Sequence, residues 1–234
     1  MIKTAVIIAG GEGSRLRPLT DRKPKTLVEV NGRPILYWII RWLKHYGIRH
    51  VVVGVAYKKE KIYKFFEKNN NFGLDVDFSV HTVKGGTANG FKLALTRFVK
   101  DKTFLAMNGD ELTNLDINKL LRAHKKHRSI VTMALSPFPC RFSVVGVDRN
   151  QMVTKFEYGK MLKEIPISIG VYIFDRDVVK YIPNTGSVEN TTFINLALRR
   201  KVSGMMLSDG EGWISINTLK DIKEAEQQPG WTKN

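Results

Sequence analysis

Short apolar runs alternate with amphipathic segments through the first half of the chain. Buried strands are predicted over residues 5–9, 50–55, 76–80 and 103–107. Helices are predicted over residues 34–46, 62–66, 87–99 and 116–127. Pro34 suits a first helical position, Gly47 a helix end and Asp116 an N-cap. Strands that alternate with helices predict a parallel sheet with helices on both faces.

The second half of the chain is richer in strands. They are predicted over residues 130–135, 143–147, 152–156 and 168–174, and helices near 191–200 and 218–227. We interpret the strands as an antiparallel lobe beside the main sheet. No repeat or linker interrupts the pattern, so we expect one domain over residues 1–228, with halves of about 1–128 and 129–228. Residues 229–234 are expected to form a frayed tail, which begins at about Gln228.

A glycine-rich turn follows the first predicted strand. Residues 10–20 read Gly-Gly-Glu-Gly-Ser-Arg-Leu-Arg-Pro-Leu-Thr, and Pro24-Lys25 follows. Glycines let a ligand approach the backbone N–H groups closely, and Arg15, Arg17 and Lys25 add cations within reach. The turn therefore predicts a grip for a triphosphate. The dinucleotide fingerprint does not fit, because its third glycine would fall at Leu16, and the phosphate loop ending in Gly-Lys-Ser/Thr does not fit either.

A second motif, Met107-Asn108-Gly109-Asp110, lies at the carboxyl end of a predicted strand. Open α/β sheets bind their ligands at such strand ends. Taken alone, Asn-Gly-Asp is equally typical of a turn. Between the two motifs, segment 85–90 is a glycine-rich loop that opens the helix expected near Thr87.

The complete opening motif with its Pro-Lys resembles that of the sugar-1-phosphate nucleotidyltransferases, the nucleoside-diphosphate-sugar pyrophosphorylases. The resemblance covers essentially the whole chain and is tight through Asp110. It implies a Rossmann-like, three-layer α/β/α fold with a mainly parallel mixed sheet and a small antiparallel sugar-binding lobe. The half 1–128 would then bind the nucleotide, and the half 129–228 would bind the sugar.

The resemblance also implies roles for individual residues. The implied catalytic residues are Arg15, Lys25 and Asp110. The residues implied to bind the nucleotide are Ala9, Gly10, Gly11, Gly13, Ser14, Arg15, Lys25, Gly86, Thr87, Asn108 and Gly109. Asp110 corresponds to the family aspartate that binds the catalytic Mg²⁺, a cation that takes oxygen ligands. Segment 86–88 matches the family loop that lies against the base, whereas Gly85, Asn89 and Gly90 depart from it.

The sugar side resembles the family less closely. Segment 142–145 stands where the family has Tyr-Gly-Val-Val, and segment 167–174 resembles Asn-x-Gly-x-Tyr-x-Phe. For the family motif Phe-x-Glu-Lys-Pro, strict alignment places Tyr158 and Gly159 at the glutamate and lysine positions, so Glu157 and Lys160 fill those roles only after a local register shift. The sugar-binding residues implied are Ser143, Glu157, Lys160, Ser168 and Gly170.

The chain departs from the family most clearly near its end. The family commonly has Trp-x-Asp-x-Gly/Asp-Thr there, and its first aspartate is a second metal ligand. Ser215 and Asn217 stand at the two acidic positions, and their oxygens carry no negative charge. Alignment with the cytidylyltransferase ending Asp-Thr-Leu-Arg-Asp also puts Asn217 in place of an aspartate. Asp209 and Glu211 are acidic residues nearby.

Composition narrows the classes of protein that remain. A net charge of +16 over 234 residues invites a nucleic-acid interpretation, but the cations are dispersed, with clusters at 58–61, 125–128 and 199–201 typical of solvated helix faces. We therefore expect no dedicated nucleic-acid partner. A lone Cys140 excludes an intrachain disulfide, and no apolar run is long enough to span a membrane. We expect a cytoplasmic protein without a membrane partner.

The implied reaction joins a nucleoside triphosphate and a sugar 1-phosphate, with Mg²⁺, to give a nucleoside-diphosphate sugar and pyrophosphate. One alternative is a cytidylyltransferase for a non-sugar phosphate such as phosphocholine. Another is a nucleotide-binding or regulatory homologue with impaired catalysis, which Ser215 and Asn217 favour. The base, the sugar and the oligomeric state stay open at this point, and a homo-oligomer is one option.

Overall fold

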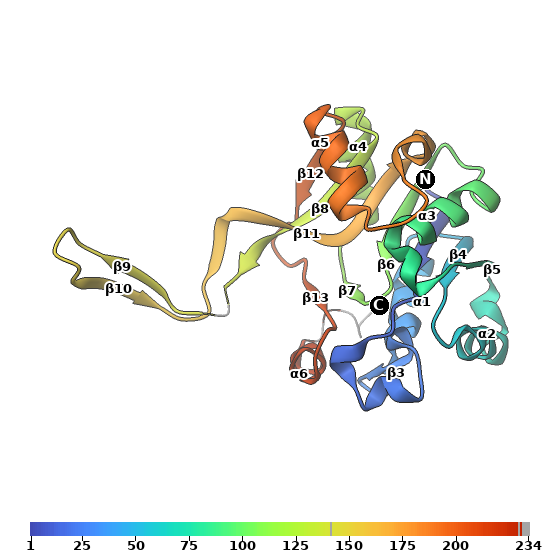
Figure 1. The fold of residues 1–234 in the computed structure, drawn as a ribbon, viewed down its shortest axis with the longest axis horizontal. Coiled ribbons are helices and arrows are strands. Elements are labelled where there is room, and N and C mark those ends of the chain that lie inside the picture. The colour runs from blue at the N-terminus through green and yellow to red at the C-terminus, as the bar shows by residue number, and fades with distance from the viewer. Residues whose placement is uncertain (141, 229, 231–234) are drawn as a thin grey trace.

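The structure, a computed structural model, describes residues 1–140, 142–228 and 230. Its helices and strands (Figure 1) are β1 (Thr4–Ile8), β2 (Glu29–Val30), β3 (Arg33–Pro34), α1 (Ile35–His45), β4 (His50–Val55), α2 (Lys59–Lys68), β5 (Asp75–Val80), α3 (Gly86–Arg97), β6 (Thr103–Asn108), β7 (Glu111–Thr113), α4 (Ile117–His127), β8 (Val131–Pro139), β9 (Val144–Val147), β10 (Val153–Glu157), β11 (Met161–Asp175), α5 (Ile194–Leu198), β12 (Val202–Met206), β13 (Trp213–Ser215) and α6 (Leu219–Gln227).

A seven-stranded sheet in the order β12-β8-β11-β6-β1-β4-β5 forms the centre of the body. β1 pairs in parallel with β4 and β6, and β4 with β5, which confirms the parallel sheet predicted for the first half. β11 runs antiparallel to both β6 and β8, so the sheet is mixed. The predicted fold class, α/β with a mainly parallel mixed sheet, is confirmed.

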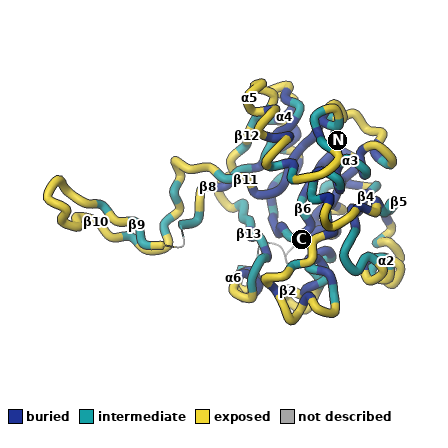
Figure 2. The backbone as a smooth tube through the Cα atoms, in the orientation of Figure 1, coloured by how far each residue is buried: buried dark blue, intermediate teal, exposed yellow. Residues whose placement is uncertain are grey.

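Helices cover both faces of this sheet, because successive side chains of each strand point to opposite sides. Ala5 and Ile7 of β1 pack in one core with the apolar faces of α1, α2 and α4. Val6, between them, packs in a second core with α3 and α5. The chain therefore forms three layers, with the sheet buried in the middle (Figure 2).

The second half differs from its predicted arrangement. β8 and β11 extend the main sheet instead of forming a lobe beside it. The reason lies in the run 169–174: Ile169, Val171 and Ile173 face the first core, while Tyr172 and Phe174 face the second. A strand that is apolar on both faces belongs inside a sheet that is covered on both sides. The short strands β7, β12 and β13 were not predicted.

In the part of the chain that the structure describes, three antiparallel pairs lie outside the main sheet, β2–β3, β7–β13 and β9–β10, and the last of them belongs to an arm. It consists of the β9–β10 hairpin and the adjoining ends of β8 and β11, and it extends away from the body (Figure 1). Nearly all of the arm is exposed or half-buried, in contrast to the strands of the body (Figure 2). The small antiparallel sheets expected beside the main sheet are present as this hairpin and the short β7–β13 pair.

The predicted helix ends are largely confirmed. The Asp116 carboxylate caps α4 by accepting hydrogen bonds from the backbone N–H groups of Asn118 and Lys119. Thr218 and Asp221 form a reciprocal capping box at the start of α6. Residues 229 and 231–234 of the expected tail lie outside the described residues. No helix in the described ranges has the length and apolar character needed to cross a bilayer.

The buried His124 predicts a pH-dependent stability. It is 4% exposed and shares a hydrogen bond of 2.9 Å with Thr132, which ties α4 to β8. Burial lowers the pKa of His124 from its usual value near 6.5. The unfolded chain therefore takes up this proton first as the pH falls. The stabilisation is complete above about pH 6.5 and is lost as the pH falls through that value toward the folded-state pKa.

We expect His124→Gln to reduce the loss of unfolding free energy between pH 7.5 and 5.5 by on the order of 1 kcal/mol, since one pKa unit corresponds to about 1.4 kcal/mol. Urea denaturation at the two pH values measures this difference. His127→Gln, which changes an exposed histidine of the same helix, is the control and should behave as the unmodified protein does. An equal pH dependence in all three proteins would contradict the assignment.

Candidate active site

The glycine-rich turn lies directly after β1, at the carboxyl end of the parallel strands. The Ala9 N–H donates to the Gly54 carbonyl at 2.7 Å, which ties the start of the turn to β4. Gly13 has a φ of +64°, a conformation that favours glycine. Its carbonyl accepts hydrogen bonds of 2.9 Å from the Leu16 N–H and the Thr20 hydroxyl. The turn is thus held by its own backbone.

Gly10 packs against a buried histidine that no motif had indicated. A Cβ at Gly10 would lie 2.3 Å from His81 Nε2, so only glycine leaves room for this ring. His81 is 7% exposed, and burial lowers its pKa, which keeps the imidazole neutral at physiological pH. The ring also lies close to Gly54 and Gly90. Three glycines therefore surround His81 below the turn.

Two of the three predicted catalytic residues, Arg15 and Lys25, contact Asn217, and the third, Asp110, contacts Lys25. Lys25 forms an ion pair with Asp110 at the end of β6, and the Lys25 ammonium also donates to Asn217 Oδ1 at 2.8 Å. The Arg15 guanidinium donates to the same oxygen at 3.1 Å. Lys25 and Asp110 are 12% and 24% exposed, so the pair is largely shielded from water. Asn217, which replaces a family aspartate, thus binds the two cations.

A cavity of about 190 Å³ opens between the turn and the end of β6. It is lined by Ile8, Ala9, Gly11, Lys25, Thr26, Thr87, Asn108, Gly109 and Asp110. Six of the residues predicted to bind the nucleotide are therefore brought together here. Gly10, Gly13, Ser14, Arg15 and Gly86 are not among the lining residues, and Gly10 and Gly13 shape the turn from below.

Gly86 and Thr87 join the start of α3 to the segment before α5. A Cβ at Gly86, where φ is +66°, would lie 2.3 Å from the Gly186 carbonyl oxygen. The Thr87 hydroxyl donates to Glu189 and accepts from the Val188 N–H, each at 3.0 Å. These two residues therefore have a packing role in the fold, and Thr87 also reaches the cavity.

Two polar atoms at this cavity have no partner among the described residues. Thr26 Oγ1 and Asn108 Oδ1 are both buried and accept or donate no hydrogen bond there. Leaving a buried polar group unpaired costs about 1–3 kcal/mol. Oxygens left unpaired beside a carboxylate are suited to a ligand that supplies donors, or to a hydrated cation.

Glu111, next to Asp110, is a second carboxyl that the motifs did not single out. It is 7% exposed, and the Trp213 indole N–H and the Ser215 hydroxyl donate to its two oxygens at 2.7 and 3.2 Å. Burial, and then the neighbouring Asp110 carboxylate, raise the pKa of Glu111 to about 8. The Asn217 amide donates to the Ser215 hydroxyl at 2.7 Å, which links Glu111 to the residues around Lys25. In the sequence, only its position directly after Asp110 could have indicated that Glu111 belongs to the site.

A larger cavity of about 610 Å³ lies between the base of the arm, β13 and the start of α6. Tyr158 and Gly159, the residues of the strict family alignment, line it. Ser215 and Asn217 line it as well, so the Lys25–Asn217 hydrogen bond lies where the two cavities meet.

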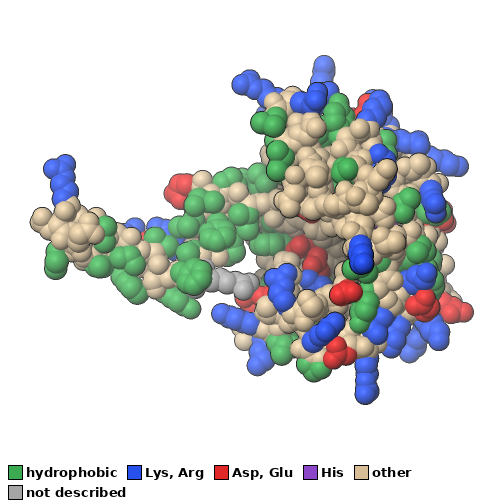
Figure 3. All heavy atoms as spheres, viewed as in Figure 1, with side chains coloured by type: hydrophobic (Ala, Val, Ile, Leu, Met, Phe, Trp, Pro, Cys, Tyr) green, Lys and Arg blue, Asp and Glu red, His purple; other side chains and the backbone are tan. Residues whose placement is uncertain are grey.

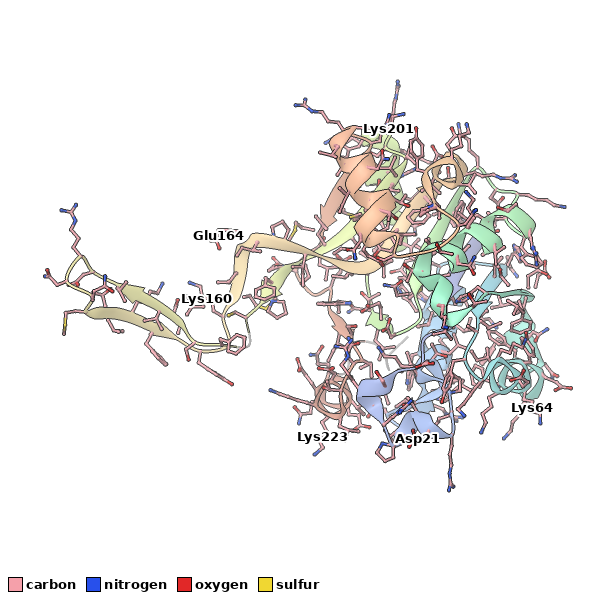
Figure 4. The ribbon with its side chains drawn as sticks, in the orientation of Figure 1. Asp21, Lys64, Lys160, Glu164, Lys201 and Lys223 are labelled. Atoms are coloured by element: carbon pink, nitrogen blue, oxygen red, sulfur yellow. The ribbon has the colours of Figure 1, made fainter. Side chains whose placement is uncertain are left out.

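The predicted sugar-binding residues are not gathered in this cavity. Glu157 and Lys160 pair with each other at 2.8 Å, and Lys160 lies on the arm (Figure 4). Ser143 precedes β9, and Ser168 is exposed on β11. Gly170, with φ at +71°, lies against Glu111, whose Cγ would be 2.9 Å from a Cβ at this position.

The two acidic residues considered as a second metal ligand lie away from Lys25 and Asp110. Glu211 accepts hydrogen bonds from the backbone N–H groups of Asp116 and Ser208, at 3.0 and 2.7 Å, and pairs with Lys119. Asp209 is exposed in a turn. Neither contacts Lys25 or Asp110 in the described structure.

A glycine-rich turn after the first strand, cations beside it and a carboxylate at the adjoining strand end are typical of α/β proteins that bind nucleoside phosphates. A profile of the nucleotidyl transferase family matches residues 4–229. The chain belongs to this family.

Three curated relatives illustrate the family. The mannose-1-phosphate guanylyltransferase of Mycobacterium tuberculosis is 29% identical, with 95% of this chain and 61% of the relative covered. The D-glycero-alpha-D-manno-heptose 1-phosphate guanylyltransferase of Campylobacter jejuni is 32% identical, with 74% and 76% covered. The UTP–glucose-1-phosphate uridylyltransferase of Synechocystis is 28% identical, with 77% and 51% covered. The chain thus spans between half and three quarters of their lengths.

Solved structures share the fold. HddC from Yersinia pseudotuberculosis, complexed with GMP-PN, superimposes with a TM-score of 0.73 at 24% identity, over 97% of this chain and 99% of that one. A structure titled a putative glucose-1-phosphate thymidylyltransferase from Bacillus anthracis gives the same TM-score and identity, over 97% and 94%.

The contact between Gly10 and His81 predicts a specific effect on stability. Gly10→Ala forces the buried imidazole to move, and such overpacking costs about 1–3 kcal/mol. Gly11→Ala is the matched control, because a Cβ there has no atom within 4 Å. Thermal denaturation without ligand should show a lower Tm for Gly10→Ala alone. Equal Tm values would mean that His81 does not pack as described.

Proposed function

We propose that this chain transfers a nucleotidyl group from a nucleoside triphosphate to a sugar 1-phosphate. The observation that carries the proposal is the meeting of the two cavities at Lys25 and Asn217. The smaller cavity, built mainly by residues 8–110, is suited to the triphosphate. The larger one, built by residues 136–228, has room for a sugar phosphate. We accordingly assign the nucleotide to the half 1–128 and the sugar to the half 129–228 of one domain.

On the nucleotide side, the backbone of residues 10–14 would bind the β- and γ-phosphates through its N–H groups. Arg15 would stabilise the departing pyrophosphate, and Lys25 would neutralise charge at the reacting phosphates. Both cations contact Asn217 in the structure, which supports a common position for them. Gly86 and Thr87 would lie near the base.

The reaction is a single in-line displacement. A phosphate oxygen of the sugar 1-phosphate forms a bond to the α-phosphorus, and the bond from this phosphorus to the α–β bridging oxygen breaks. Pyrophosphate leaves with the electron pair, so no covalent intermediate on the enzyme is needed. Catalysis then consists mainly of positioning and of charge neutralisation.

Asp110 would hold a Mg²⁺ ion, the metal that the family implies. The donor set supports this role, because the Asp110 carboxylate faces the same cavity as the unpaired oxygens of Thr26 and Asn108. Such a cation, when bound, would supply positive charge that stabilises the phosphate oxygens. Lys25 keeps the Asp110 carboxylate in place through its ion pair.

The names of the curated relatives suggest which substrates to test first. Guanylyltransferases for mannose 1-phosphate and for a manno-heptose 1-phosphate are among them, so we propose GTP and a manno-configured sugar 1-phosphate. Glucose 1-phosphate with UTP, CTP or dTTP is the comparison pair. Phosphocholine with CTP tests the alternative that the weak sugar-side motifs left open.

Pyrophosphate release from these pairs with Mg²⁺ tests the proposal. We expect Lys25→Ala and Asp110→Ala to reduce kcat by on the order of 10²–10³, since each removes a charge from the transferring phosphates. Lys23→Ala is the matched control: Lys23 pairs with Glu29 outside the cavity, and its loss should leave kcat unchanged. Near-normal turnover of Lys25→Ala or Asp110→Ala would contradict the assigned roles, and no release from any pair would contradict the function.

A further inference from the structure

Glu111 is a buried carboxyl whose partners are neutral. It accepts hydrogen bonds from Trp213 and Ser215, and no ion pair of the described residues includes it. A buried carboxylate is costly unless a charge compensates it. The residue nonetheless follows Asp110 directly in the chain, and its two hydrogen-bond partners, Trp213 and Ser215, line the larger cavity.

Hydrogen bonds connect Glu111 to the residues around Lys25. Residues Glu111 and Ser215 are direct partners in the antiparallel β7–β13 pair, so their side chains share a face. Asn217, two residues further along, binds both Ser215 and Lys25. Gly170 supplies the space on the other side, because any Cβ there would meet the Glu111 side chain. Glu111 is therefore connected to Asp110 through Ser215, Asn217 and Lys25.

We propose that Glu111 is the second carboxylate ligand of the divalent cation held by Asp110, an inference that rests on the proposed function. Mg²⁺ commonly uses one or two carboxylates together with substrate phosphates. A cation between Asp110 and Glu111 supplies the positive charge that the buried Glu111 carboxylate lacks. Thr26 Oγ1, 4% exposed as a residue and unpaired, belongs to the cavity that Asp110 lines and independently indicates a ligand beside Asp110.

Ser215, in β13, stands where the family resemblance implies an acidic metal ligand. In this proposal Glu111, in β7, supplies that negative charge in its place. The Ser215 hydroxyl lies 3.2 Å from Glu111 Oε1, so a carboxylate at position 215 would reach the place that Glu111 occupies. The β7–β13 pair thus has one carboxylate at this position, and it belongs to Glu111 of β7 and not to residue 215 of β13. A carboxylate moved back to β13 should restore the metal site when Glu111 is neutralised.

Titration of the ligand-free chain with Mn²⁺ alone, followed by electron paramagnetic resonance, tests the proposal. We expect Glu111→Gln to weaken Mn²⁺ binding about tenfold or more, and the double variant Glu111→Gln/Ser215→Asp to recover most of that loss. The glutamine side chain keeps an oxygen that can accept the hydrogen bond from Trp213. If Glu111 has only a structural role, Mn²⁺ binding should therefore be unchanged in this variant. Glu211→Gln, which removes another buried carboxylate tied to Lys119, is the control.

Wild-type affinity in Glu111→Gln, or no recovery in the double variant, overturns the proposal. Circular dichroism establishes that each variant is folded. Pyrophosphate release by the unmodified protein is measured in parallel. Release together with unchanged Mn²⁺ binding in Glu111→Gln rejects only the Glu111 role, whereas an absence of release rejects the proposed function.

A second, independent observation is the apolar face of the arm. Val145 pairs with Phe156 and Val147 with Val153, so these four side chains lie on one face of the hairpin. They are 45–69% exposed. Lys155 and Glu157, which form an ion pair, belong to the opposite, polar face. Figure 3 shows apolar side chains along much of the arm.

The exposed apolar area of the arm as a whole, with both faces and its base counted, is on the scale of an interface. Ten large apolar side chains of the arm are 38–79% exposed: Phe138, Phe142, Val145, Val147, Met152, Val153, Phe156, Tyr158, Met161 and Ile165. At roughly 150–250 Å² for an aromatic side chain and somewhat less for the others, they expose on the order of 1,000 Å². A standard interface buries about 800 Å² on each partner. A two-stranded hairpin is also marginal on its own.

We infer that this face binds the same face of a second copy of the chain. Residues 142–158 contain two cations and two acids and are neutral, although the chain carries +16. Contact through such a neutral face keeps the like charges of two strongly basic bodies out of the interface itself. A two-fold contact of identical faces joins apolar surface to apolar surface. Since Tyr158 and Gly159 also line the larger cavity, the dimer would fix one wall of it.

Sedimentation velocity of the full chain tests this inference. We expect a dimer of twice the 26.6 kDa chain mass at micromolar concentration. Phe156→Gln should raise the dimer dissociation constant about tenfold to hundredfold, as loss of a buried aromatic anchor does. Lys155→Gln introduces the same residue on the polar face and should leave it unchanged. A monomeric unmodified protein, or equal dissociation constants for the two variants, overturns the inference.

Discussion

The ion pair between Lys25 and Asp110 is the interaction on which the site depends. It joins the segment after the glycine-rich turn to the end of β6, and Asn217 adds the connection before α6. Such a shielded pair is maintained only where further hydrogen bonds satisfy the charges. Asn217 provides one to Lys25 and another to Arg15. The two cavities adjoin here because Lys25, which lines the smaller one, donates a hydrogen bond to Asn217, which lines the larger one.

Glycines support the site from behind as well as at its surface. At Gly10 and Gly170 the backbone passes so close to another side chain that a Cβ would collide with it. The side chains concerned, His81 and Glu111, are polar and buried. Close packing of this kind positions groups precisely where a single additional methyl group would displace them. Gly10 and Gly170 are therefore needed for packing against buried polar side chains, whatever their part in letting a ligand approach the backbone.

Much of the first half could be predicted because its signals are local. Residues 50–55 form β4 as expected, Asp116 caps α4, and the strand–helix alternation gives the parallel order β5-β4-β1-β6. In the second half, the apolar spacing of 168–174 identified a strand but not its neighbours. β11 pairs with β6 and β8 because both of its faces are buried. Any apolar run could be buried in this way, so the sequence of 168–174 does not specify which strands lie beside it.

The sequence by itself determined the class of fold and predicted which residues of the turn 10–14 and which cations would bind phosphates, since strand, turn and cation spacing are encoded within short segments. It also identified Asp110 as the carboxylate that faces this turn. The tertiary structure decided which distant groups join them: Asn217 bridges two cations, His81 supports Gly10, and Glu111 lies opposite Ser215. These contacts span tens to hundreds of residues, and their geometry arises only when the strands have paired.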